Sequence, residues 1–187
     1  MTTIAFLGLG HMGGPMAANL VKAGHRVLGF DPVPAAREAA TATGVEMLAS
    51  GQDAAASADV VITMFPGGRH VLDAYRGSAE APGLLAVAKP GTLFIDCSTI
   101  AVDEAQDAHR LAQEAGHRSL DAPVSGGVVG AENATLAFMV GGDESEFAAA
   151  LPLLESMGRR IVHCGGPGLG QAAKVCNNMI LGISQIA

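Results

Sequence analysis

The chain has 187 residues, which is enough for one α/β domain with a substantial core and short for two domains. It carries 11 Lys and Arg against 18 Asp and Glu, and this net charge of −7 argues against a surface that follows nucleic-acid phosphates. Although 49% of the residues are hydrophobic, no apolar run reaches the roughly 18 to 20 residues of a membrane helix, so we expect neither nucleic-acid nor membrane partners.

Short apolar runs with β propensity alternate with alanine-rich segments of helical spacing along the chain. The predicted strands are residues 3–7, 27–30, 60–64, 93–96, 119–122, 136–140 and 160–163. The predicted helices are residues 12–23, 34–43, 102–115, 144–157 and 171–186. This alternation predicts a Rossmann-type α/β fold, a doubly wound, mainly parallel sheet with helices on both faces.

Two features bear on the cellular compartment. The amino-terminal residues lack the positive region of a signal peptide and lead directly into a glycine motif, so we expect a cytoplasmic protein. Cys97, Cys164 and Cys176 are odd in number and lack the spacing of metal ligands. We interpret them as reduced thiols and predict no metal site.

A glycine fingerprint follows the first predicted strand. Gly8, Gly10 and Gly13 have the G-x-G-x-x-G spacing, and His11 and Met12 lie between the last two. The first glycine permits a tight turn, the second lets the backbone approach a pyrophosphate, and the third lets the helix pack closely on the sheet. The helix amino terminus adds free N–H donors to bind phosphate. The motif predicts dinucleotide binding, in preference to a glycine-rich turn without a ligand.

Asp31 ends the second strand at about the 20-residue distance expected for a ribose-binding acid. A carboxylate at this place accepts hydrogen bonds from the ribose hydroxyls of NAD and repels the 2′-phosphate of NADP. Pro32 offers no N–H, and Arg37 lies a turn or more beyond. The alternative is that Asp31 only caps the next helix. The pattern favours NAD as the cofactor.

The last predicted helix carries a polar stripe. Gln171, Lys174 and Asn178 fall at positions i, i+3 and i+7 of a helix that is otherwise mostly apolar. If the Lys174 amine is buried, desolvation lowers its pKa, and the lysine is able to accept and return a proton near neutral pH. The alternative is a lysine that extends to solvent beside an amide. Helix geometry alone does not choose between them.

Three segments resemble the 3-hydroxyisobutyrate dehydrogenase family of the β-hydroxyacid dehydrogenase superfamily. They are FLGLGHMG at residues 6–13, DAPVSGG at residues 121–127 with FMVGG at 138–142, and GLGQAAKVCNN at residues 168–178. The resemblance implies that Lys174 is the catalytic lysine and that Asn178 contacts the substrate. It also implies that Ser125, Gly126 and Gly127 receive the substrate carboxylate, for which a hydroxyl and successive backbone N–H groups are suited.

The resemblance further implies cofactor contacts beyond the glycine fingerprint. Phe65 and Pro66 match a segment that lies along the cofactor, and Thr99 matches a residue at the nicotinamide end. The family has an all-helical domain after the long helix, which supplies contacts between subunits. We therefore expect residues 1–166 to form the NAD-binding domain and residues 167–187 to begin an interdomain helix, with the helical domain absent. We expect the complete protein to be a homo-oligomer.

The expected function is NAD-dependent oxidation of a small β-hydroxy acid, with Lys174 as general acid and base. The resemblance favours oxidation of 3-hydroxyisobutyrate to methylmalonate semialdehyde, a step of valine degradation. The alternatives are an enzyme similar to tartronate-semialdehyde reductase, a reductase of imines or other short semialdehydes, and a truncated dinucleotide-binding module without activity.

Overall fold

The predicted strands all pair in one sheet in the computed structural model, which describes residues 1–186. The strands are β1 (Thr3–Leu7), β2 (Arg26–Phe30), β3 (Glu46–Met47), β4 (Val60–Thr63), β5 (Leu93–Asp96), β6 (Arg118–Asp121), β7 (Val124–Ser125), β8 (Leu136–Gly141) and β9 (Gly158–Gly165). The helices are α1 (Gly13–Lys22), α2 (Pro34–Ala42), α3 (Gly51–Ser57), α4 (Gly68–Arg76), α5 (Leu84–Val87), α6 (Val102–Glu114), α7 (Gly127–Glu132), α8 (Glu144–Glu155) and α9 (Leu169–Ile186). The Rossmann-type prediction is confirmed.

The sheet is mainly parallel, as the sequence predicts. Its order is β3-β2-β1-β4-β5-β6-β8-β7, and β9 pairs with β8. All the pairs from β3 to β6 are parallel, whereas β8 runs antiparallel to β6 and to β7. Because β1 lies between β2 and β4, the direction of winding reverses at β1, and the crevice beyond its carboxyl end is the usual ligand site of such sheets.

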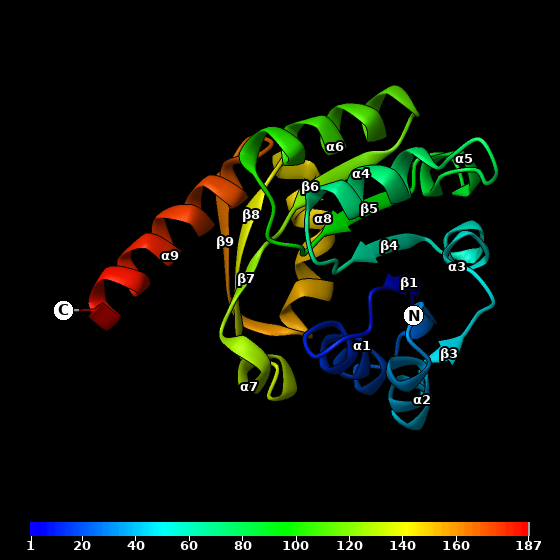
Figure 1. The fold of residues 1–187 in the computed structure, drawn as a ribbon, viewed down its shortest axis with the longest axis horizontal. Coiled ribbons are helices and arrows are strands. Elements are labelled where there is room, and N and C mark those ends of the chain that lie inside the picture. The colour runs from blue at the N-terminus through cyan, green and yellow to red at the C-terminus, as the bar shows by residue number, and fades with distance from the viewer. Residues whose placement is uncertain (187) are drawn as a thin grey trace.

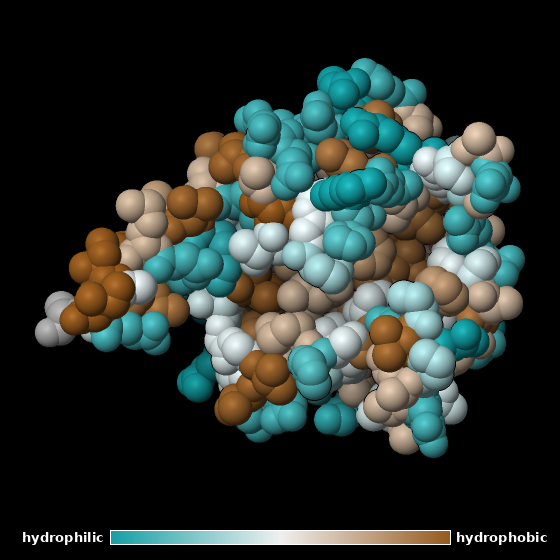
Figure 2. Space-filling view, viewed as in Figure 1, coloured by the Kyte–Doolittle hydropathy of each residue, from teal (hydrophilic) through white to brown (hydrophobic). Residues whose placement is uncertain are grey.

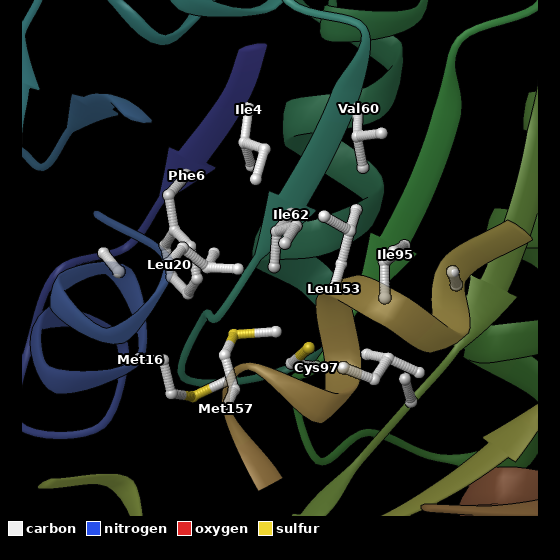
Figure 3. Close-up of a cluster of buried hydrophobic side chains, with 14 of the residues drawn as sticks. Ile4, Phe6, Met16, Leu20, Val60, Ile62, Ile95, Cys97, Leu153 and Met157 are labelled. Atoms are coloured by element: carbon white, nitrogen blue, oxygen red, sulfur yellow. The ribbon is translucent and has the colours of Figure 1, made fainter. Parts of the chain in front are cut away.

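Side chains alternate between two cores on opposite faces of the sheet. In β1, Ile4 and Phe6 belong to one core, whereas Ala5 and Leu7 belong to the other. Helices α1, α2, α7 and α8 cover the first core, which Figure 3 shows in part, and α3 to α6 cover the second. Strands that are buried on both faces consist of continuous apolar runs, so these strands could be predicted from the sequence.

Six short elements were not predicted. They are β3, β7, α3, α4, α5 and α7, the longest of which is α4 with 9 residues. Helices α4 and α7 begin at the glycine pairs 67–68 and 126–127, which in sequence are typical of loops. Tertiary packing overrides that preference. A Cβ on Gly68 would lie 2.0 Å from a carboxylate oxygen of Glu104, so a larger residue here would displace the Glu104 side chain of α6.

Helix α9 leaves the body of the molecule and projects away from the sheet (Figure 1). One side of its first turns is buried, whereas Met179, Ile180 and Ile183 are exposed, and Figure 2 shows apolar side chains beside hydrophilic ones on the projecting part. Ala187 lies outside the described residues. None of the helices in residues 1–186 combines the length and the hydropathy of a membrane span.

Phe94 of β5 provides a test of the second core. Its ring lies 5.2 Å from the ring of Tyr75 in an edge-on arrangement and 5.2 Å from that of His117. Phe94→Leu removes both aromatic contacts, and we expect the free energy of unfolding to fall by about 1–2 kcal/mol. In urea denaturation, the matched variant Phe30→Leu, at a half-buried position, should lose less than about 1 kcal/mol. Equal losses for the two variants would contradict this assignment of the core.

Candidate active site

The predicted site residues gather at the carboxyl ends of the parallel strands. The glycine fingerprint follows β1, Asp31 follows β2, and the segment from Met64 to Pro66 follows β4. Thr99 lies just after β5. Since the ends of parallel strands meet at one edge of the sheet, these four segments surround the crevice at the reversal of winding.

The glycine fingerprint has the geometry that a dinucleotide loop needs. Gly8 has a φ of +91°, and a Cβ there would lie 2.3 Å from the carbonyl oxygen of Met64. A Cβ on Gly13 would lie 1.9 Å from the carbonyl oxygen of Gly8, so this glycine lets α1 approach the loop. By contrast, nothing lies within 4 Å of a Cβ on Gly10. The open side of the loop is therefore where a phosphate would approach the backbone.

The amino terminus of α1 adds donors to this loop. Its N-cap residue is Met12, and no side chain caps the helix. Gly14 N–H already donates to the carbonyl oxygen of Gly10 and Pro15 has no N–H, so the amide of Gly13 is the helix donor that can reach a phosphate. The helix dipole also favours an anion at this place. The side chain of His11, on the loop, is exposed. The loop and the helix terminus together fit the pyrophosphate of a dinucleotide.

Asp31 is buried, and its carboxylate binds both the glycine loop and the N-cap residue of α2. Its Oδ2 accepts a hydrogen bond of 2.7 Å from the backbone N–H of Leu9, and its Oδ1 accepts one of 2.8 Å from Val33. The N-cap residue of α2 is Val33, and no side-chain cap is formed. The alternative role of Asp31 as a helix cap is therefore not observed. Each carboxylate oxygen can accept a further hydrogen bond, so the ribose-binding role stays a prediction.

A cavity of about 480 Å³ lies where the strand ends face α9. It brings together the predicted residues Met12, Thr99, Ser125, Gly126, Gly127, Lys174 and Asn178. Met64, Val124 and Leu181, which the sequence did not single out, complete its lining. The other predicted residues do not line this cavity and lie at the adjoining strand ends and glycine loop: Gly8, Gly10, His11, Gly13, Asp31, Phe65 and Pro66.

Lys174 contributes a buried amine to the cavity. Its residue is only 8% exposed, although the neighbouring Val175 on the same helix is exposed. Burial lowers the pKa of the Lys174 amine, because it disfavours the charged form. Among residues 1–186, no group accepts a hydrogen bond from this amine or forms an ion pair with it. The structure thus places Lys174 inside the protein and not in solvent.

Asn177 is a neighbour of the Ser125 loop that sequence reasoning missed. Its Nδ2 donates to Ser125 Oγ at 3.4 Å and to Asn178 Oδ1 at 3.5 Å. The signal in the sequence is the pair of adjacent asparagines, of which only the second falls on the polar stripe. Asn177 connects α9 with the predicted carboxylate loop.

A buried carboxyl lies beneath the cavity, at the end of β5. Asp96 Oδ1 accepts hydrogen bonds from Thr63 Oγ1 at 2.8 Å and from Ser98 Oγ at 2.6 Å, whereas its Oδ2 has no partner among the described residues. Ser98 Oγ in turn accepts a bond from the N–H of Phe65. Burial raises the pKa of Asp96 from 3.8 to about 6, against the opposing effect of these hydrogen bonds.

No three His, Cys, Asp or Glu side chains within residues 1–186 form a candidate metal-binding group. Cys97 is fully buried, and burial raises the pKa of its thiol well above the ordinary value. The polar groups that line the cavity are the amine of Lys174, the amide of Asn178, the hydroxyls of Thr99 and Ser125, and backbone N–H groups.

Comparison with known proteins agrees with this geometry. A family model described as the NAD binding domain of 6-phosphogluconate dehydrogenase matches residues 3–166. The whole chain is 59% identical over 187 residues to a probable 3-hydroxyisobutyrate dehydrogenase of Mycobacterium tuberculosis and covers 62% of that protein. It is 50% identical over 186 residues to the NAD-dependent L-serine dehydrogenase of Pseudomonas aeruginosa, of which it covers 61%.

A solved structure supports the same relationship. The 3-hydroxyisobutyrate dehydrogenase of Mycobacterium tuberculosis, solved with L-serine, matches with a TM-score of 0.94 at 59% identity. The match covers 100% of this chain and 62% of the other. The chain thus spans a little over three fifths of the length of these relatives.

The buried carboxyl of Asp96 generates a prediction about stability. The pKa of Asp96 is about 6 in the folded chain and 3.8 when unperturbed, so the folded state binds the proton more tightly. The contribution of this group to stability is therefore lost as the pH rises from about 4 to about 6. In Asp96→Asn this loss should be absent, and urea denaturation across that pH range, compared with the unaltered chain, should show a flatter dependence on pH. Parallel pH dependences for the two proteins would contradict the assignment.

Proposed function

Because the chain belongs to the family of the NAD binding domain of 6-phosphogluconate dehydrogenase and is similar over its whole length to 3-hydroxyisobutyrate dehydrogenases, we propose that it oxidises a small β-hydroxy acid with NAD. The observation that carries this proposal is the buried amine of Lys174, without an ionic partner among residues 1–186, in one cavity with the Ser125–Gly127 loop. The loop suits a carboxylate, and the amine suits the hydroxyl of the same small molecule.

The residues of the cavity divide the reaction between them. Ser125 Oγ and the backbone N–H groups of Gly126 and Gly127 bind the substrate carboxylate. Asn178 holds the substrate hydroxyl beside Lys174. Since burial lowers the pKa of Lys174, a neutral amine is available to accept the hydroxyl proton, and the ammonium returns it in the reverse direction. NAD, when held by the glycine loop of Gly8, Gly10 and Gly13, would supply the hydride acceptor for the carbon that bears this hydroxyl. Holding the reacting groups in contact supplies much of the rate.

The cavity favours 3-hydroxyisobutyrate over L-serine, the ligand of the solved relative. The two molecules share a hydroxymethyl group and a carboxylate and differ in a methyl group against an ammonium group. Met12, Met64 and Leu181 offer apolar contacts, and among residues 1–186 the cavity lining contains no Asp or Glu to pair with an ammonium. An unpaired buried charge is costly, so the methyl group is the better fit. L-serine is the second candidate, because one relative is named an L-serine dehydrogenase.

We propose NAD in preference to NADP on the basis of Asp31. The carboxylate lies next to the glycine loop, at the place where the adenosine ribose of a dinucleotide is expected. A 2′-phosphate there would face a negative charge. The following residues, Pro32 and Val33, carry no charge, and the next cation along the chain, Arg37, has its guanidinium over the ring of Phe30, 5.9 Å from its centre.

The proposed division of the chain follows the direction of α9. Residues 1–166 form the dinucleotide-binding domain, and residues 167–187 begin an interdomain helix that leads to a helical domain in the complete protein. The exposed apolar side chains of Met179, Ile180 and Ile183 suit contact with such a domain or with a second subunit. We propose a homo-oligomer for the complete protein.

Lys174→Ala tests the reaction. With NAD and 3-hydroxyisobutyrate, turnover followed by the ultraviolet absorbance of NADH should fall by about a hundredfold or more, because the general base is lost. NADH binding, followed by the fluorescence of the nucleotide, should be unchanged. Lys89→Ala is the matched control, since this lysine pairs with Asp59 on the surface and should leave turnover unaltered.

Two results would overturn parts of this proposal. Equal turnover in Lys174→Ala and in the unaltered chain would remove Lys174 from the reaction. Turnover of L-serine that exceeds turnover of 3-hydroxyisobutyrate would replace the preferred substrate by the second candidate.

Asp31→Asn tests the choice of cofactor. The amide keeps the shape of the side chain and removes its charge, so the preference for NADH over NADPH in direct binding should fall by about tenfold, or about 1.4 kcal/mol. The chain contains no Trp, so nucleotide fluorescence is measured without interference from that residue. A preference that is unchanged would show that Asp31 only supports the glycine loop.

A further inference from the structure

We infer that Asp121 is the positioning residue that fixes the direction in which Lys174 enters the cavity, by binding the amino terminus of α9. The inference rests on the proposed function, because it explains how the amine reaches the reaction site. Asp121 itself does not line the cavity. Its effect on the reaction is therefore indirect and passes through the helix.

Both carboxylate oxygens of Asp121 bind the first turn of α9. Oδ1 accepts a hydrogen bond of 2.7 Å from the N–H of Gly168, and Oδ2 accepts one of 2.9 Å from the N–H of Gln171. The first amides of a helix have no partner within it, and a carboxylate at this end also interacts favourably with the helix dipole. Asp121 is 6% exposed, so these bonds form away from water, where a misplaced helix would leave a buried charge unpaired.

The contact is close because glycines lie on both sides of the carboxylate. A Cβ on Gly141 of β8 would lie 2.4 Å from Asp121 Oδ1, and a Cβ on Gly170 of α9 would lie 2.7 Å from Oδ2. A Cβ on Gly170 would also lie 2.5 Å from the carbonyl oxygen of Met139. The backbone of α9 thus rests directly on the sheet at this point, and any larger residue would lift the helix.

Gln171 fixes the rotation of the helix at the same place. Its side chain is fully buried, with Oε1 accepting from the N–H of Ile100 at 3.2 Å and Nε2 donating to the carbonyl oxygen of Ser98 at 2.8 Å. These two residues flank Thr99, which lines the cavity. Lys174 follows Gln171 by three residues and therefore lies on the same side of the helix. The bonds of Asp121 and Gln171 together fix the direction in which the Cα–Cβ bond of Lys174 leaves the helix.

Asp121 directs Lys174 without pairing with it. The carboxylate uses both oxygens on backbone donors, and no ion pair joins it to Lys174 within residues 1–186. Burial raises the pKa of Asp121 against the effect of its amide bonds, and burial lowers the pKa of Lys174. A direct ion pair would instead raise the pKa of the lysine. The two explanations therefore predict opposite changes in the pKa of Lys174 when Asp121 is neutralised. A positioning role predicts a rise, and a direct charge effect predicts a fall.

The test is the pKa of Lys174 in Asp121→Asn, measured in this chain. The chain has three lysines, Lys22, Lys89 and Lys174, so reductive methylation with ¹³C gives few signals, and Lys22→Arg and Lys89→Arg assign them by NMR. The amide replaces one acceptor by a donor that faces a backbone N–H, which loosens the first turn. We expect the lysine to gain contact with water and its pKa to rise towards the ordinary value, while NADH binding is unchanged.

The matched control is Asp143→Asn. Asp143 is the N-cap residue of α8, is exposed and forms no side-chain cap, so its neutralisation removes the same charge without touching α9. It should leave the Lys174 signal unmoved. In turnover assays, Asp121→Asn should lower kcat by about tenfold to a hundredfold, as expected for a misplaced reacting group, with the KM for NAD unaltered.

The possible outcomes are distinct. A folded Asp121→Asn variant in which the pKa of Lys174 falls would show a direct charge effect, and an unchanged pKa would show no connection; either result overturns the inference. If this variant does not fold, Gln171→Met, which removes the other two bonds, is measured by the same signal with the same expected rise. If the pKa of Lys174 rises in the variant but the unaltered chain shows no turnover, the result would support the positioning role of Asp121 and count against the proposed oxidation.

Discussion

One physical constraint shapes the proposed site: the amine of Lys174 is held inside the structure with no anion beside it among residues 1–186. Such a group is costly to bury while it is charged, so the fold must prevent Lys174 from turning outward to water. The sheet meets this requirement at the base of α9, where the helix touches β6, β8 and the segment after β5. The lowered pKa of the lysine is a result of that geometry.

The carboxyl ends of the strands supply the rest of the site because of the order of the sheet. β1, β4 and β5 are neighbours, so the glycine loop, Met64 and Thr99 reach the same crevice although they are distant in sequence. The buried network of Asp96 and Ser98 connects two of these segments, since Ser98 accepts from the N–H of Phe65 and its carbonyl accepts from Gln171. The nucleotide side and the substrate side of the site thus share one set of hydrogen bonds.

Much of this arrangement is predictable from the sequence, for physical reasons. Strands buried on both faces are continuous apolar runs, and the spacing of Gly8, Gly10 and Gly13 reflects three separate steric needs, two of which are visible in the structure. The polar stripe of α9 follows from helical periodicity alone. The burial of Lys174 does not follow from this periodicity, because the pattern is the same whether the lysine faces a cavity or solvent.

Asp121 belongs to the DAPVSGG segment, but its contact with Gly168 spans 47 residues, and no local sequence pattern indicates such a contact. The helices α4 and α7 were missed because glycine pairs at their starts meet packing needs that composition does not express.

The position of the lysine along α9 has a mechanical consequence. The helix is held at its first turn, and Lys174 lies about 4.5 Å beyond Gln171 along the axis, whereas Ile186 lies about 22 Å beyond it, at about 1.5 Å per residue. A tilt of about 5° about that base would therefore move the backbone at Lys174 by about 0.4 Å and the far end by about 2 Å, by the same rise per residue. The helix behaves as a lever with the amine close to its pivot. The distal turns can therefore shift by about 2 Å while the Lys174 backbone stays in register with the cavity.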